Sequence, residues 1–314
     1  MSNTAGSWIL SEGLAGLQAQ ALGLAEAAGL TPAMHVLKPE GIWKHIPARF
    51  WPRPLSVAAV TPPFPDLTIA CGGKAAVVAA AMRGGSRRIV QVQNPRIAIN
   101  RFDVIVANRH DELTGPNVIV TRTALHRVTT ARLTQEAEIW RDRLAGLKRP
   151  LVAVLLGGNN GRYTLDTTVG GRLAADLAAM AQRDGVGIAV TPSRRTDPVV
   201  TELMRDALAP VGGWVWDFTG DNPYFGMLAL ADMIVVTQDS VSMISEAAAT
   251  SVPVYFAPLP GKSRRQGIFI DTMIQEGRVR PFEGRFAPWP VTPLNDTPFA
   301  AAEMCRRLGL QDPG

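Results

Sequence analysis

Residues 239–246 combine the side chains best suited to bind an anion. Asp239, Ser240, Ser242, Ser245 and Glu246 fall within eight residues, directly after a short apolar run and at the start of an expected helix. Aspartate or serine at a helix start satisfies free N–H groups, and the N-terminal end of a helix attracts anions. The stretch could therefore hold phosphate and ribose hydroxyls, although a capped helix with a polar first turn has the same sequence.

Two further turns fit the same chemistry. Arg194 and Arg195 follow Ser193 after another apolar run, and paired arginines can neutralise a diphosphate through forked hydrogen bonds. The alternative interpretation of these arginines is a solvated loop with local salt bridges. Gly157 and Gly158 begin a glycine-rich turn that would let backbone N–H groups approach a ligand, or would simply form a tight turn. The turn lacks the full G-x-G-x-x-G spacing, so by itself it does not indicate a dinucleotide.

Two residues could act as a general base. Glu12 follows the first expected strand, and His110 with Asp111 follows a later one. Either Glu12 or His110 could take a proton from an acceptor hydroxyl. Neighbouring side chains point apart in extended chain, so Asp111 need not orient His110. A carboxylate in a surface turn and a hydrogen-bonding loop histidine are the alternatives.

Several classes of protein are excluded by composition. Two cysteines cannot make a disulfide framework or a cysteine-rich zinc site, and the four scattered histidines contain no H-x-x-x-H, so no metal site is predicted. The basic pairs are too short to indicate a nucleic-acid partner. No apolar run approaches the roughly 20 residues of a membrane span. The first basic residue is Lys38, which argues against a secretory signal and favours a cytoplasmic protein.

The elements that position these residues alternate between apolar runs and helical patterns, which predicts an α/β fold. Strands are expected at 7–10, 67–71, 88–93, 102–107, 118–121, 151–156, 186–190, 214–218, 233–237 and 252–257. Helices are expected at 14–28, 74–82, 134–147, 172–183, 199–208, 223–231, 240–250, 269–276 and 298–308. The proline-rich stretch 30–65 is expected to be loop. Ligands of open parallel sheets bind outside the carboxyl ends of the strands, where all the candidate residues fall.

The 314 residues suggest two domains. The strand–helix pattern restarts after Lys148-Arg149-Pro150, which predicts one Rossmann-like domain over 1–147 and another over 150–290. The helix at 298–309 is expected to pack back on the first. Residues 1–149 carry 18 Lys and Arg against 10 Asp and Glu, and residues 150–314 carry 14 against 17, so the net charges are +8 and −3. The halves are therefore expected to hold different ligands.

Taken in order, these stretches resemble the "elongated mitochondria" family of mitochondrial-fission proteins, whose bacterial members are classed as glycosyltransferases of GT-B type. The resemblance runs over nearly the whole chain and rests on WILSEGLAG at 8–16, TQDSVSMISE at 237–246, and residues 20–29, 91–96, 109–111, 115–118, 156–158, 191–196, 222–224, 253–255 and 278–284. It implies two Rossmann-like domains facing across a cleft. The second domain would hold a nucleoside-diphosphate sugar and the first the acceptor, with no bound metal.

The resemblance also implies roles for individual residues. The donor would be held by Gly157, Gly158, Ser193, Arg194, Arg195, Asp239, Ser240, Ser242, Ser245 and Glu246, with Glu246 on the ribose hydroxyls. Glu12 or His110 would be the base of an inverting reaction, and Gly13, Asn94, Arg96 and Asp111 would line the cleft. Related bacterial proteins often carry aspartate at the positions of Glu12 and Asn94. Glutamate at 12 keeps a base one methylene further out, whereas Asn94 cannot be a base.

The sequence thus predicts a glycosyltransferase (EC 2.4) that moves a sugar from a nucleoside-diphosphate sugar to a glycan or lipid-linked acceptor, with no tightly bound cofactor. A non-catalytic fission-type adaptor is one alternative. A nucleotide-sugar epimerase or oxidoreductase is another, but no tyrosine here is followed by lysine four residues on, as short-chain epimerases require. The positive charge of the first half predicts an anionic membrane surface as partner, with the protein peripheral on the inner face of the cytoplasmic membrane.

Overall fold

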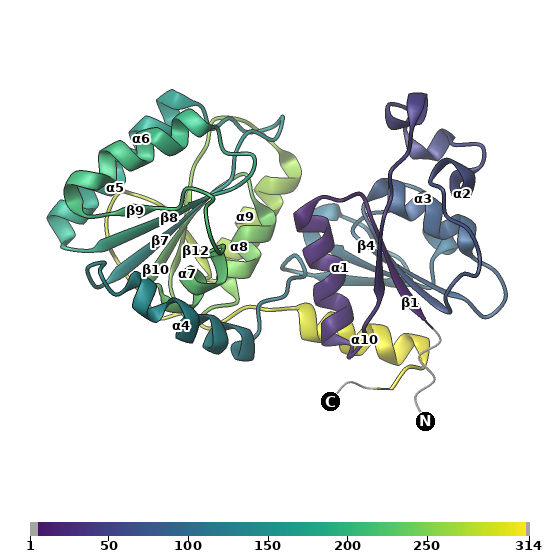
Figure 1. Cartoon of the computed structure of the whole chain (residues 1–314). Coiled ribbons are helices and arrows are strands. Elements are labelled where there is room, and N and C mark those ends of the chain that lie inside the picture. The colour runs from purple at the N-terminus through teal and green to yellow at the C-terminus, as the bar shows by residue number, and fades with distance from the viewer. Residues whose placement is uncertain (1–5, 312–314) are drawn as a thin grey trace. The chain divides into compact units, whose positions relative to one another are not determined.

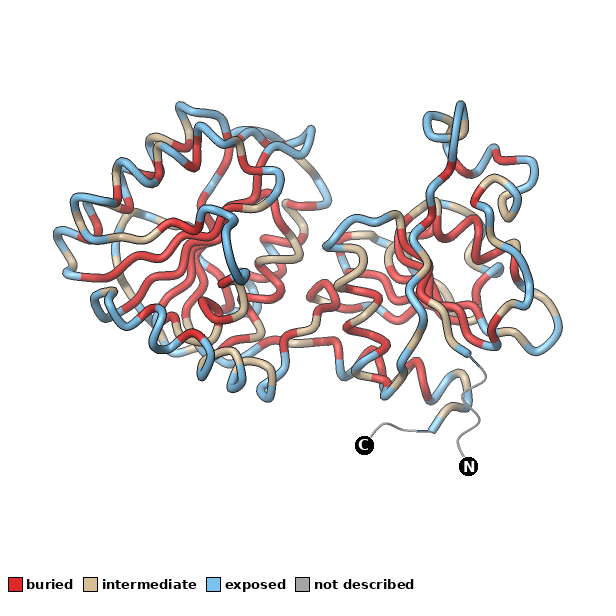
Figure 2. Tube along the Cα trace, viewed as in Figure 1, coloured by how far each residue is buried: buried red, intermediate tan, exposed pale blue. Residues whose placement is uncertain are grey.

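The computed structural model describes residues 6–311, and the chain divides into two compact units (Figure 1). Unit 1 comprises Met1–Arg127 and Asp296–Gly314, and unit 2 comprises Val128–Asn295. Each unit is built on one six-stranded sheet in which every paired strand is parallel. The predicted α/β class is confirmed. Parallel sheets need helices on both faces, so their central strands are buried, as the red strands of Figure 2 show.

The sheet of unit 1 has the strand order β2-β1-β3-β4-β5-β6. Its strands are β1 (Ser7–Ser11), β2 (Ala33–Val36), β3 (Leu67–Cys71), β4 (Arg88–Val92), β5 (Val104–Asn108) and β6 (Val118–Thr121). Its helices are α1 (Ala15–Ala27), α2 (Pro54–Val57), α3 (Gly73–Met82) and α10 (Thr297–Leu308). One apolar core lies between the sheet and α1 with α10, and another between the sheet and α3.

The sheet of unit 2 has the order β12-β11-β10-β7-β8-β9. Its strands are β7 (Leu151–Leu156), β8 (Gly187–Pro192), β9 (Trp214–Val215), β10 (Met233–Thr237), β11 (Val254–Ala257) and β12 (Val279–Pro281). Its helices are α4 (Thr130–Leu144), α5 (Thr167–Asp184), α6 (Pro198–Leu208), α7 (Tyr224–Leu230), α8 (Val241–Ala248) and α9 (Arg264–Gln275). The core under α5 and α6 lies on one face, and the core under α4, α7, α8 and α9 on the other.

Each sheet has one topological switch point. In unit 1 the chain runs from β1 to β2 on one side and then returns to β3 on the other. In unit 2 it runs from β7 to β8 and β9, and then returns to β10 on the opposite side of β7. Loops leave a switch point in opposite directions and open a crevice at the carboxyl ends of the two central strands. The fold therefore singles out the ends of β1 and β3 in unit 1, and of β7 and β10 in unit 2.

The structure differs from the sequence-based expectation at β2, at α4 and at β12, which lies where no strand was expected. β2 lies inside the stretch expected to be loop. Most of its side chains are exposed, so the sequence there has no apolar pattern that predicts a strand. The helix expected to close the first domain, α4, belongs to unit 2 instead, since its buried Trp140 packs into the unit 2 core beside Gly226. A Cβ at Gly226 would lie 2.2 Å from the Trp140 ring. The chain thus enters unit 2 at Val128, ahead of α4, rather than at Lys148–Pro150.

This boundary changes the charge division. Unit 1 carries 15 Lys and Arg against 10 Asp and Glu, and unit 2 carries 17 of each. The whole net charge of +5 therefore falls on unit 1, while unit 2 is neutral.

Candidate functional site

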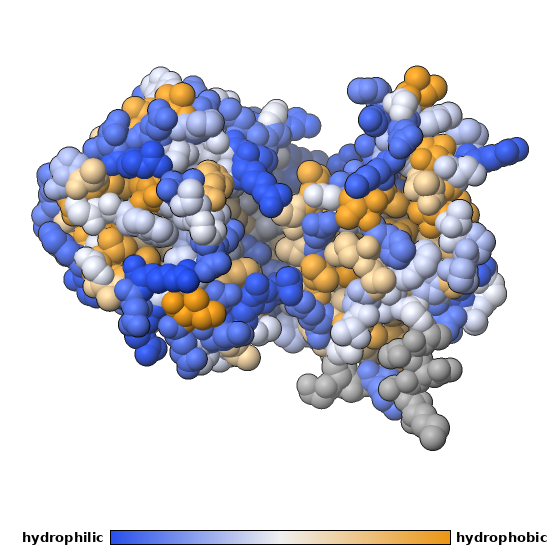
Figure 3. All heavy atoms as spheres, viewed as in Figure 1, coloured by the Kyte–Doolittle hydropathy of each residue, from blue (hydrophilic) through white to orange (hydrophobic). Residues whose placement is uncertain are grey.

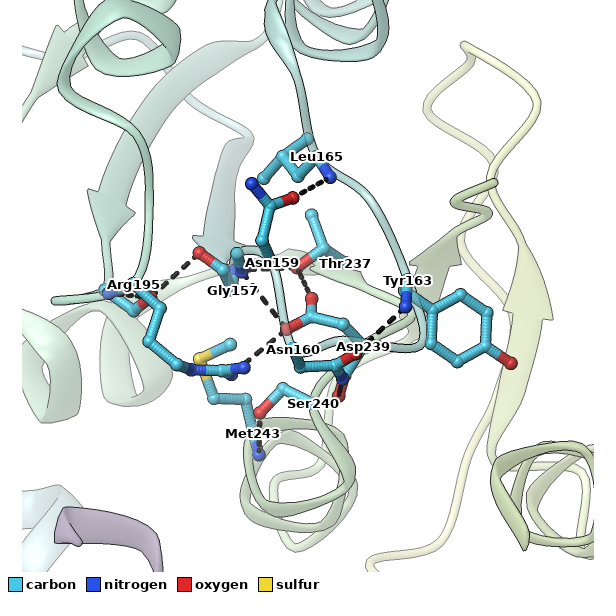
Figure 4. A network of polar contacts seen from close by, with 12 residues as sticks. Gly157, Asn159, Asn160, Tyr163, Leu165, Arg195, Thr237, Asp239, Ser240 and Met243 are labelled. Carbon is cyan, nitrogen blue, oxygen red and sulfur yellow. Dashed lines mark hydrogen bonds and ion pairs between the residues drawn. The ribbon is translucent and has the colours of Figure 1, made fainter. Parts of the chain in front are cut away.

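A closed polar network lies at the switch point of unit 2 (Figure 4). The side chain of Asp239, just past β10, is fully buried. Its Oδ2 accepts the N–H of Gly158 at 3.1 Å and Nη2 of Arg195 at 3.0 Å, and its Oδ1 accepts the hydroxyl of Thr237 at 2.7 Å. These donors offset the cost of burying the charge. Asp239 is therefore an internal anchor that ties the ends of β7, β8 and β10 together.

The two glycines after β7 make room for this network. A Cβ on Gly157 would lie 2.1 Å from Oδ1 of Asp239, and a Cβ on Gly158 would lie 2.1 Å from the carbonyl oxygen of Arg195. The N–H of Gly157 also donates to the hydroxyl of Thr237 at 2.7 Å. We expected these glycines to let a ligand approach; in the structure, neighbouring chain already occupies the space a Cβ would need.

The loop after β8 places two arginines differently. The hydroxyl of Ser193 donates to the carbonyl of Gly157 at 2.8 Å and accepts the N–H of Arg195 at 3.2 Å. Arg195 is thereby fixed against Asp239. Arg194 is exposed and has no hydrogen bond or ion pair to any described residue. The guanidinium of Arg195 is thus held by Asp239, whereas that of Arg194 is available to a ligand.

Two asparagines that the sequence analysis did not single out complete the loop. Asn160 donates through Nδ2 to the carbonyl of Asp239 at 3.2 Å and accepts the N–H of Tyr163 at 2.9 Å. Asn159 accepts the N–H of Leu165 at 2.8 Å. An asparagine pair directly after two glycines is the available signal, since asparagine side chains commonly fold their own turns.

Helix α8 is fixed at both of its ends. Ser240 caps the start, accepting the N–H of Met243 at 3.3 Å, and Ser242 lies half-buried in the first turn. At the far end, the buried Arg278 donates through Nε to the carbonyl of Ala248 at 3.0 Å, and burial lowers its pKa to about 10. The positive end of the helix dipole therefore lies at the switch point. Ser245 is buried further along the helix.

Glu246 lies apart from the Asp239 network. It is buried on α8, and one of its carboxyl oxygens accepts the hydroxyl of Tyr224 at the start of α7. Burial raises the pKa of Glu246 to about 7, although the Tyr224 hydrogen bond and the charge of Arg132 pull it down. Burial also raises the pKa of Tyr224 well above its usual value, so the phenol stays a donor.

The switch point of unit 1 holds Glu12. The half-buried Glu12 follows β1, and its Oε1 accepts the N–H of Lys74 at 2.9 Å in the first turn of α3. Gly72 precedes that helix at φ +99°, and a Cβ there would lie 2.7 Å from Oε1 of Glu12. The amide of Gln91 donates to the carbonyl of Gly72 at 3.4 Å. Glu12 is thus oriented by a helix N-terminus.

His110 and Glu12 are not brought together. His110 follows β5, three strands from β1, which separates the two by about 14 Å at normal strand spacing. His110 is buried, and its Nε2 lies 3.9 Å from Oδ1 of the equally buried Asp111. Its N–H donates to the side chain of Asn108 at 3.2 Å.

The remaining residues expected in the cleft form local turns. Asn94 accepts the N–H of Arg96 at 2.9 Å, and Arg96 has a positive φ of 57°, so the two fold the turn after β4. Gly13, at φ +82°, donates its N–H to the hydroxyl of Ser11 at 3.2 Å. Among residues 6–311, no group of three or more His, Cys, Asp or Glu side chains could hold a metal ion. Nor does any helix in that range have the length and apolar character to cross a membrane.

The fold places the protein in a class known from solved structures. UDP-GlcNAc 2-epimerase from Methanocaldococcus jannaschii matches with a TM-score of 0.61 at 12% identity, covering 96% of this chain and 99% of that one. UGT71G1 of Medicago truncatula, solved in complex with UDP-glucose, matches with a TM-score of 0.52 at 10% identity, covering 98% of this chain and 91% of that one. Both units together therefore have the GT-B type of fold, two Rossmann-like domains in one chain.

Within this class the sequence identifies the family. Residues 15–308 match the family Mitochondrial fission ELM1, and the chain belongs to it. The mitochondrial fission protein ELM1 of Arabidopsis thaliana is 32% identical over 276 residues, which are 78% of this chain and 64% of that protein. The chain thus spans less than two thirds of the length of its plant relative.

Proposed function

We propose that the protein is a glycosyltransferase in which unit 2 binds a nucleoside-diphosphate sugar and unit 1 binds the acceptor. One observation carries the proposal. The switch point of unit 2 presents an exposed arginine, a fixed arginine and the capped N-terminus of α8 at one sheet edge, and proteins with this fold have been solved with UDP-sugars. Phosphate charge is stabilised by this combination of guanidinium groups and a helix N-terminus.

The structure divides the proposed phosphate contacts between two arginines. Arg195 spends one nitrogen on Asp239, yet about half of its side chain is exposed. Arg194 has its whole guanidinium for the ligand. The N–H groups of Val241 and Ser242, at the start of α8, would supply further donors. Together they would stabilise the negative charge on the departing diphosphate without a metal ion.

Glu12 is the stronger candidate for the base. It is half-buried rather than enclosed, it lies at a switch point, and the N–H of Lys74 fixes one of its oxygens. The other oxygen would take the proton of an acceptor hydroxyl while that hydroxyl oxygen bonds to the sugar carbon and the bond to the diphosphate breaks. His110 is enclosed at the end of β5, which argues against it.

Glu246 remains a predicted contact for the ribose. The hydroxyl of Tyr224 already occupies one of its oxygens, which leaves the other for one ribose hydroxyl. Replacing Glu246 would also remove the partner of the partly buried Tyr224, so this residue is a poor probe of binding alone.

Calorimetry against UDP-, GDP-, ADP- and CMP-sugars tests the proposal. We expect the wild-type protein to bind one nucleotide class, and Arg194→Ala to weaken that binding by about tenfold or more, the usual value of a charge-assisted hydrogen bond. The matched control is Arg172→Ala, another exposed arginine of unit 2 that lies on α5. A wild-type protein that binds none of these donors would remove the glycosyltransferase proposal.

Product analysis separates transfer from the rival activity. After incubation with the bound donor alone, NMR would detect an epimerised nucleotide sugar if the protein were an epimerase. Tight donor binding that yields no epimer, and no transfer product when amphiphilic acceptors are added, would favour the adaptor.

A further inference from the structure

A second surface lies beside the switch point of unit 1. We define the basic segment as residues 37–58, which follow β2 and include α2; in Figure 1 it is the dark purple chain that rises above the sheet of unit 1. It carries Lys38, Lys44, Arg49 and Arg53 against Glu40 alone. Its net charge of +3 is more than half of the +5 carried by unit 1, and all four cations are exposed.

The basic segment also exposes large apolar side chains. Ile42 and Phe50 are 66% and 62% exposed, and hydrophobic atoms gather at its tip in Figure 3. The guanidinium carbon of Arg49 lies 4.8 Å from the centre of the Phe50 ring. Apolar side chains are thus held in water with cations beside them, an arrangement that costs free energy unless something covers it.

The exposure of these side chains is not a consequence of a loose loop. Leu37, Ala48, Trp51 and Ala58 of the same segment are buried in the core under α3. Nε1 of Trp51 donates to the carbonyl of Ile46 at 3.0 Å, which closes the turn that carries Phe50. The segment is therefore anchored from below and presents Ile42 and Phe50 outward.

We propose that the basic segment docks unit 1 onto an anionic lipid surface. A stable interfacial anchor combines apolar side chains at the acyl boundary with a basic patch, and both are present here. A protein partner is less favoured, because the core of a protein interface is depleted of charge, whereas four exposed cations share this short segment with Ile42 and Phe50. The docking itself does not depend on the glycosyltransferase proposal.

Docking at this place would bring lipid headgroups to Glu12. The segment begins at the carboxyl edge of the sheet, where the N–H of Leu37 donates to the carbonyl of Ser11 at 2.8 Å, one residue before Glu12. If unit 1 binds the acceptor, as proposed above, the acceptor class is an amphiphile whose polar group stands at the membrane surface.

Co-sedimentation with vesicles tests the docking. We use the full chain with vesicles of equimolar phosphatidylglycerol and phosphatidylcholine, or of phosphatidylcholine alone. The wild-type protein should bind only the anionic vesicles, and raised salt should weaken the binding. Arg49→Gln with Arg53→Gln should reduce partitioning by roughly fivefold per charge removed. Lys148→Gln with Arg172→Gln changes the net charge equally in unit 2 and should leave binding unchanged.

The apolar contribution has its own matched control. Phe50→Ser and Ile42→Ser should each reduce binding to anionic vesicles, whereas Phe299→Ser, at a phenylalanine that is 57% exposed on α10, should not. Equal binding to both kinds of vesicle, equal loss in the control variants, or no binding would overturn the proposal. So would a change of oligomeric state in Phe50→Ser, by light scattering, without a change in vesicle binding. Because no donor is present, failure here leaves the nucleotide-binding proposal standing.

Discussion

The two switch points have a similar geometry, but their carboxylates differ in burial and in ion pairing. In each, a carboxylate from one strand end accepts a backbone N–H at the neighbouring strand end, Asp239 from Gly158 and Glu12 from Lys74. Asp239 is fully buried and paired with Arg195, so its charge is neutralised within unit 2. Glu12 is half-buried and has no ion pair to a described residue. In the function proposed above, unit 2 binds the phosphate charge, with Arg194 available for it, and Glu12 of unit 1 takes the proton.

Glycine substitutions should give the largest contrast between the switch points. Gly157→Ala drives a Cβ into the Asp239 carboxylate, and we expect the free energy of unfolding to fall by about 3 kcal/mol or more. Gly73→Ala is the control, since a Cβ there meets nothing within 4 Å, and it should change stability by less than about 1 kcal/mol. Denaturant unfolding measures both. Equal losses of stability in the two variants would contradict the close contact between Gly157 and Asp239.

Removing the two carboxylates should give a smaller contrast. Asp239→Ala leaves Arg195 and the N–H of Gly158 without their buried acceptor, which should cost about 2–4 kcal/mol. Glu12→Ala exposes the N–H of Lys74 at a helix start and should cost about 1 kcal/mol. Asp239→Asn should recover part of the loss, because an amide can still accept from Gly158 and donate to Thr237. Thermal unfolding ranks the three variants, and a Glu12→Ala loss as large as that of Asp239→Ala would contradict the comparison.

The pH dependence of the two units should have opposite signs. Burial raises the pKa of Glu246 from 4.5 to about 7, so folded unit 2 binds the extra proton and loses stability as pH rises through that window. Burial lowers the pKa of His126 from 6.5 to about 4, against the charge of Asp296, so unit 1 loses stability as pH falls through that window. Each effect should amount to about 1–3 kcal/mol.

Single substitutions separate the two titrations. Glu246→Gln should gain stability over wild type as pH rises, and His126→Gln should gain as pH falls. Unit 1 can be followed by thiol labelling, because Cys71 and Cys305 are both buried in it and unit 2 has no cysteine. Burial raises the pKa of the Cys71 thiol, and the charge of Glu12 adds to the effect. A thiol reagent can therefore react with Cys71 only after unit 1 opens. If the stability difference between a variant and the wild type does not change with pH, the titration assigned to that residue is contradicted.

Sequence reasoning located the strand ends because buried parallel strands read as apolar runs followed by glycine or polar turns. Glu12, Gly157 and Asp239 all stand in such turns. Their partners could not be predicted: whether Asp239 contacts a ligand or Arg195 depends on strand order, which no local pattern contains. The separation of His110 from Glu12 is likewise a property of strand order. The fold class needed only the alternation of elements, and it was correct.

The misplaced boundary has a similar cause. α4 is polar enough to read as a linker helix, and only the packing of Trp140 against Gly226 commits it to unit 2. β2 was missed because the exposed side chains of an edge strand carry no pattern. The donor-binding roles of the serines on α8 and of Arg194 stay predictions.

Donor affinity in two single variants tests the division of labour most directly. Calorimetry with the nucleotide sugar that the wild-type protein binds should show about tenfold or greater weakening in Arg194→Ala and unchanged affinity in Glu12→Gln. Loss of affinity in Glu12→Gln, with Arg194→Ala binding like the wild type, would contradict the account.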